Sequence, residues 1–100
     1  MNLHPGSTVY AAAIWWSQND PFIHIVGTSK AKVEREAKRA MKDAARQAYN
    51  NEEFETLRAA NNTIRWNGVH SFRLADLVSD REYDEAVRDL ESGGIYYAEG

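Results

Sequence analysis

The stretch TVYAAAIWWS at residues 8–17, followed after a short gap by FIHIV at residues 22–26, decides the fold of this 100-residue chain. Apolar, aromatic and β-branched side chains favour strands in both stretches. The intervening Gln18-Asn19-Asp20-Pro21 is typical of a turn, because Asn and Asp bond to their own backbone and Pro cannot donate to a sheet. We therefore expect an antiparallel β-hairpin that ends at Gly27.

Both faces of this expected hairpin are apolar. Side chains alternate along a strand, so one face of residues 8–17 carries Ile14 and Trp16, and the other carries Val9 and Trp15. An antiparallel sheet with one wet face alternates apolar with polar residues instead. Two interpretations stay open. Either other parts of the chain cover the second face, or part of it, with Trp15 and Trp16, is a protein-contact patch.

A long helix is expected next. Thr28 or Ser29 is a suitable N-cap, and apolar residues recur at helical spacing up to about Tyr49 without an interior Gly or Pro. A short further helix is expected over residues 52–60, where Phe54 and Leu57 are three apart.

The second half predicts another hairpin and helix. Asn67-Gly68, between TIRW and VHSFRL, is the pattern of a type I′ turn. A strict two-residue turn places Ile64 and Trp66 on the face opposite Phe72 and Leu74. A longer loop or a bulge would place all four on one face. The strict turn and the longer connection both remain open. Ser79 and Glu82 form a capping box, with Val78 and Tyr83 at the staple positions. This last helix ends at Gly93-Gly94, and residues 95–97 form a closing strand.

The expected order is therefore ββα-(α)-ββα-β, in one compact domain over residues 1–100. The fold class is α+β, a mainly antiparallel sheet with helices packed on it. The length is near the commonest domain size, and no Ser-, Gly- or Pro-rich linker divides the chain. The repeated hairpin–helix order indicates either two related units or the general likeness of amphipathic helices.

Charge is distributed unevenly along the chain. Residues 1–50 hold seven Lys and Arg against four Asp and Glu, whereas residues 51–100 hold five against eleven. On the long helix, five cations fall on the side opposite the apolar residues. We call this set the basic stripe: Lys32, Arg35, Arg39, Lys42 and Arg46. Three interpretations of the stripe stay open. It is a solvated helix face, or it binds an acidic protein surface or a phosphate backbone. Alternatively, it pairs with the acidic half of the chain, within one molecule or between protomers.

No pattern of catalysis or metal binding is present in the sequence. Cysteine is absent, which excludes disulfides and thiolate sites and favours a cytoplasmic setting. The start MNLHPGST lacks the features of a signal peptide, and no apolar run is long enough to span a membrane. His4, His24 and His70 lack metal-ligand spacing, and there is no P-loop, GxSxG or GxGxxG. We expect no enzyme, no metal and no cofactor.

The sequence thus favours a small, non-catalytic protein-binding module with a regulatory or inhibitory role. Its expected target is a protein with an acidic or nucleic-acid-binding surface, and a homodimer is a further option. In size and lack of motifs the chain is similar in style to phage and mobile-element proteins that occupy a surface of a target. The expected contacts are the basic stripe together with Trp15 and Trp16. The alternative is direct nucleic-acid binding by the basic stripe, although the acidic second half argues against wrapping DNA.

Overall fold

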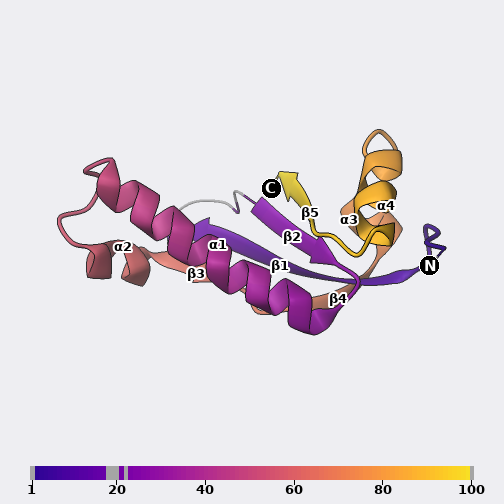
Figure 1. Cartoon of the computed structure of the whole chain (residues 1–100), viewed down its shortest axis with the longest axis horizontal. Helices are drawn as coiled ribbons and strands as arrows, with labels where there is room; N and C mark the ends of the chain where they lie inside the picture. The colour runs from indigo at the N-terminus through magenta and orange to yellow at the C-terminus, as the bar shows by residue number, and fades with distance from the viewer. Residues whose placement is uncertain (1, 18–20, 22, 100) are drawn as a thin grey trace.

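The structure is a computed structural model that describes residues 2–17, 21 and 23–99, and it confirms the predicted α+β class (Figure 1). The elements in chain order are β1 Thr8–Trp16, β2 Ile23–Gly27, α1 Lys30–Asn50, α2 Leu57–Thr63, β3 Ile64–Trp66, β4 His70–Arg73, α3 Leu74–Leu77, α4 Tyr83–Glu91 and β5 Tyr96–Glu99. Most of the predicted turn at residues 18–21 lies outside the described residues, as does Phe22.

The predicted first hairpin is confirmed and forms the centre of the sheet. β1 pairs with β2 in antiparallel register from Tyr10↔Gly27 to Ile14↔Ile23. β5 adds to β2, with Val26 opposite Tyr96, and its bounds are 96–99 where residues 95–97 were predicted. β3 and β4 both pair with β1, which gives the order β3-β1-β2-β5 with β4 beside β1. A mainly antiparallel sheet is therefore correct.

The predicted Asn67-Gly68 hairpin is wrong, because β3 and β4 lie end to end along β1. Trp66 is opposite Ile14 and His70 is opposite Ala11, so residues 67–69 lie against only residues 12 and 13 of β1. This is a β-bulge. Gly68 has φ 78°, so the left-handed backbone that the Asn-Gly pair signals is used in the bulge and makes no turn. The interpretation as two related hairpin–helix units fails with the hairpin.

The bulge explains why the apolar residues flanking it cannot share a face. Ile64 and Trp66 pack in the cluster with Ile14 beneath α1, whereas Phe72 and Leu74 pack in the cluster with Val9. Each face of the sheet carries a buried cluster, so both sets of side chains are accommodated.

Helices cover the two faces of the sheet unequally. α1 crosses one face and buries Val33 and Ala37 against Ile25. α3 and α4 lie at the end of the sheet near the N-terminus, and α2 lies towards the other end (Figure 1). Leu90 of α4 packs with Val9 on the face opposite α1. The chain itself therefore covers the second apolar face at the Val9 end.

The start of α1 follows the sequence prediction. Ser29 is the N-cap, and its hydroxyl accepts a hydrogen bond from the N–H of Lys32 at 3.3 Å. Just before it, the chain leaves β2 close beneath α1. A Cβ at Gly27 would lie 2.8 Å from the Val33 side chain and 3.0 Å from that of Ile95, so only glycine fits here without a shift of its neighbours.

The two later helices begin further along the chain than predicted. α2 begins at Leu57 behind the N-cap Thr56, because Glu52 adopts φ 63° and the chain forms a loop before it. α4 begins at Tyr83, so the capping box at Ser79 is wrong. The Glu82 carboxylate accepts a hydrogen bond from the Tyr96 hydroxyl at 3.3 Å instead. Among the described residues, no helix is both long and apolar enough to cross a bilayer.

Candidate binding face on α1

The basic stripe lies on the solvent side of α1. The buried residues of this helix are Val33, Ala37, Ala45 and Ala48, and the first two pack against the sheet. Four members of the stripe are exposed and Lys32 is half-buried. Between residues 32 and 46 the stripe extends about 21 Å at 1.5 Å per residue. The helix thus presents a row of cationic side chains to solvent.

The acidic second half does not neutralise this face within the described part of the chain. The ion pairs there are all local: Lys38–Glu34, Arg39–Glu36, Arg39–Asp43 and Arg73–Asp76. No described carboxylate forms an ion pair with Lys32, Arg35, Lys42 or Arg46. The option of intramolecular pairing with the acidic half therefore has no support among these residues.

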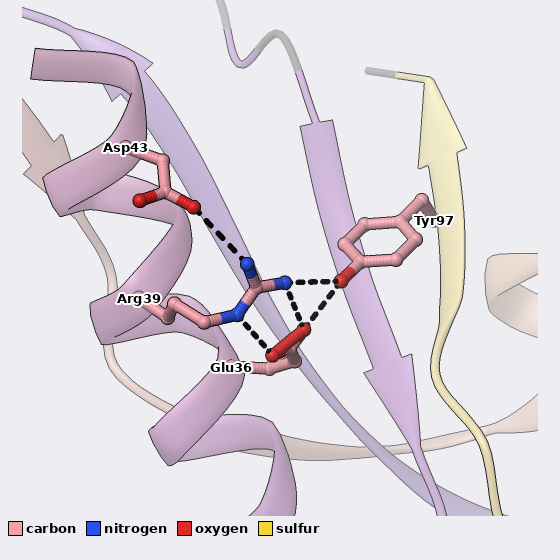
Figure 2. Close-up of polar contacts among 4 residues, drawn as sticks. All are labelled: Glu36, Arg39, Asp43 and Tyr97. Atoms are coloured by element: carbon pink, nitrogen blue, oxygen red, sulfur yellow. Dashed lines mark hydrogen bonds and ion pairs between the residues drawn. The ribbon is translucent and has the colours of Figure 1, made fainter. Parts of the chain in front are cut away.

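Arg39 differs from the rest of the stripe because two carboxylates already hold it (Figure 2). Its Nε and Nη2 donate to the two Glu36 oxygens at 2.6 and 2.8 Å, and its Nη1 donates to Asp43 at 3.0 Å. The Tyr97 hydroxyl of β5 donates to Glu36 Oε2 at 2.5 Å. This cluster ties the edge strand β5 to α1, so the charge of Arg39 is largely balanced.

The same contacts shift the pKa values in the cluster. The pKa of Glu36 is lowered from 4.5 to about 2, first by the hydrogen bonds from Arg39 and then by the one from Tyr97. The positive field of Arg35 contributes to this lowering. The pKa of Tyr97 is raised, first by burial and then by its hydrogen bond to Glu36. Glu36 is therefore ionised at neutral pH and has a structural function.

A groove of about 620 Å³ lies beside the stripe, between α1, α2 and β3. Met41, Ile64 and Trp66 supply its apolar surface, and Asn61 of α2 lies at one side. Lys38, Arg39 and Lys42 of α1 also line it. Arg39 and Lys42 belong to both the groove and the stripe, so the two features form one continuous surface.

The groove offers hydrogen-bond donors that have no partner among the described residues. The indole N–H of Trp66 makes no hydrogen bond to a described residue. Because no buried polar side-chain atom of the described residues lacks a partner, this N–H is accessible to solvent. Lys42 and the side chain of Asn61 likewise make no hydrogen bond to a described residue. An occupant of this groove therefore meets an apolar wall and a rim that is predominantly positive.

The side chains of the two predicted tryptophans lie off the stripe and point to opposite faces of the sheet. Trp16 is half-buried in the cluster beneath α1, and its ring lies 5.7 Å from that of Phe54. Trp15 is half-buried and, by strand alternation, points to the opposite face, with Arg65 as its neighbour across the sheet. The seven predicted residues do not form one site, and the contact role of Trp15 and Trp16 stays a prediction.

No grouping of metal ligands emerges from the described residues. No three His, Asp or Glu side chains among them are arranged to hold an ion. His70 of β4 contacts the Asn67 carbonyl in the bulge at 2.6 Å, and His24 is half-buried in β2. The exposed cations of α1 carry the sign of charge that attracts an anion.

Sequence reasoning missed the groove although it identified several of its residues. The helical spacing of apolar residues up to about Tyr49 includes Met41, and Trp66 was expected on a strand. Their proximity depends on β3 pairing with β1, which the expected hairpin concealed. With that pairing known, the apolar residues of β3 would have been expected beside α1, and this would have indicated the groove.

Comparison of the chain with protein-family models, with curated proteins and with solved structures finds no match.

Proposed function

We propose that this chain is a non-catalytic binding module that takes an acidic segment of a partner protein on the outward face of α1. One observation carries the proposal: Lys32, Arg35, Lys42 and Arg46 form no ion pair with a described carboxylate. Like charges at such spacing repel by a few tenths of a kcal/mol. An acidic partner would remove that repulsion and steer its own approach.

A protein partner fits better than a nucleic acid for two reasons. Glu36 and Asp43 lie on the same helix and balance Arg39, which interrupts the cationic surface that a phosphate backbone would follow. Residues 51–100 carry eleven acidic side chains against five basic ones, and these would repel nucleic acid that extends beyond the helix. A module that only binds acts by occupying its partner's surface, so its role is regulatory or inhibitory.

Charge reversal on the stripe tests this function. The variant combines Arg35→Glu with Arg46→Glu, two exposed residues that form no hydrogen bond or ion pair with a described residue. A labelled polyglutamate peptide at low salt is the probe, and fluorescence anisotropy measures its dissociation constant. We expect the variant to weaken binding at least tenfold, since both substitutions replace attraction with repulsion.

The control makes the same change in net charge elsewhere. Arg81→Glu with Arg88→Glu alters two exposed cations near α4 and should leave peptide binding within about twofold. Absence of peptide binding to the native chain, or equal weakening by both variants, contradicts the proposal. A single-stranded or duplex oligonucleotide is the second probe. Stripe-dependent binding of the oligonucleotide alone, with a log–log salt slope near -4, assigns the face to nucleic acid.

A further inference from the structure

We infer that the groove between α1, α2 and β3 takes one apolar side chain of the acidic partner segment, so that the partner is an acidic peptide with an aromatic or large aliphatic anchor. This inference rests on the proposed function and specifies its partner. It is carried by the apolar surface of Met41, Ile64 and Trp66 directly beside Lys42 of the stripe.

The composition of the groove determines what can occupy it. A purely ionic ligand would leave the exposed parts of Met41 and Trp66 in water, and a purely apolar one would leave the rim cations unmatched. A nucleobase carries several donors and acceptors, but the neutral polar groups among the described residues that line the groove are the Asn61 amide and the Trp66 indole N–H. A hydrocarbon or aromatic side chain flanked by carboxylates fits both parts of the surface.

The position of the groove indicates a polymer as the occupant. The groove is open to solvent and joins the stripe at Lys42, while Arg35 and Arg46 extend the cationic face in both directions. These two arginines are separated by about 16 Å along the helix axis. An occupant that reaches the groove and both arginines must be a chain, and an extended peptide of a few residues spans this distance.

Charge complementarity fixes the sign of that peptide. Among the groove's described side chains, Lys38, Arg39 and Lys42 are cationic and none is anionic. Lys38 and Arg39 already pair with Glu34 and Glu36, whereas Lys42 has no carboxylate partner among described residues. A partner carboxylate next to the anchor therefore meets Lys42, and the indole N–H of Trp66 can donate to the peptide beside it.

The test compares two acidic probe peptides that differ at one position. Both are labelled and Glu-rich, and one carries a single central Phe where the other carries Gly. Burial of the Phe ring in the groove should make the Phe peptide bind the native chain about tenfold more tightly. Asn61→Tyr places a bulky ring at the groove and should abolish this advantage. Asn62→Tyr is the matched control, because Asn62 is exposed on the same helix but does not line the groove.

The outcomes separate this inference from the proposed function. Loss of the Phe advantage in Asn61→Tyr, with its retention in Asn62→Tyr, supports the groove. Equal binding of both peptides, still weakened by Arg35→Glu with Arg46→Glu, overturns the groove and leaves the proposed function standing. A Phe advantage that survives Asn61→Tyr also overturns the groove. If neither peptide binds the native chain, both the function and the groove are wrong.

Discussion

The hydroxyl of Tyr97 illustrates what single residues contribute to this molecule. It joins the edge strand β5 to α1 by donating to Glu36, a residue 61 positions away in sequence. Helical spacing places Glu36 and Arg39 on one flank of α1, because residues three apart are neighbours on a helix. The third partner depends on the order of strands in the sheet, and nothing local in the sequence reveals it. Pairwise contacts within α1 could therefore be predicted, whereas the cluster could not.

The Glu36 cluster should make stability depend on pH. The pKa of Glu36 is about 2 in the folded chain against 4.5 as the ordinary value. The ionised carboxylate therefore stabilises the folded chain above about pH 4.5, and this stabilisation is lost as the pH falls towards 2. We expect Glu36→Gln to lower the free energy of unfolding by about 1 kcal/mol at pH 7, as for a well-formed surface ion pair. Urea denaturation at pH 7 and near pH 2 should show this difference shrinking towards zero. A deficit that is equal at both pH values would contradict the assignment.

Glu55→Gln is the matched control for this prediction. Glu55 is exposed, and it forms no ion pair or hydrogen bond with a described residue. Its replacement should change the free energy of unfolding by less than about 0.5 kcal/mol at either pH.

At the scale of elements, β1 organises the molecule because three other strands pair with it. Its run of apolar residues from Val9 to Trp16 indicated a strand with two apolar faces, and α1 and α4 do pack on opposite faces. The same length allows β3 and β4 to bind end to end, which local turn chemistry could not foresee. The Asn-Gly signal correctly located a left-handed glycine, but whether that conformation makes a turn or a bulge depends on the strand beside it.

The bulge gives a prediction at this scale. Asn67 Oδ1 accepts a hydrogen bond from the Ala13 N–H at 2.8 Å, at a part-buried position in the middle of β1. Asn67→Ala leaves that N–H without its acceptor and should lower the free energy of unfolding by about 1–3 kcal/mol. The urea midpoint should fall while the m-value stays constant. Asn62→Ala, at an exposed position of α2, should stay within about 0.5 kcal/mol of the native chain. Equal effects of the two substitutions would mean that the side chain of Asn67 does not hold the bulge.

At the scale of the whole molecule, charge is segregated and the ion pairs of the described residues stay within single elements or adjacent ones. The basic stripe could be predicted from helical periodicity alone, because its members lie on one element. The groove could not, because it joins three elements. The structure thus adds an apolar subsite to a cationic face, and the two together define the proposed partner.

The most direct test of the binding face is a ¹H–¹⁵N chemical-shift titration of the native chain with the Phe-containing acidic peptide. We expect the largest shifts at Arg35, Lys42 and Arg46 of α1, at Asn61, and at the indole N–H of Trp66, with α4 unchanged. Absence of shifts on α1, or shifts centred on α4 or on the indole of Trp15, would contradict the account.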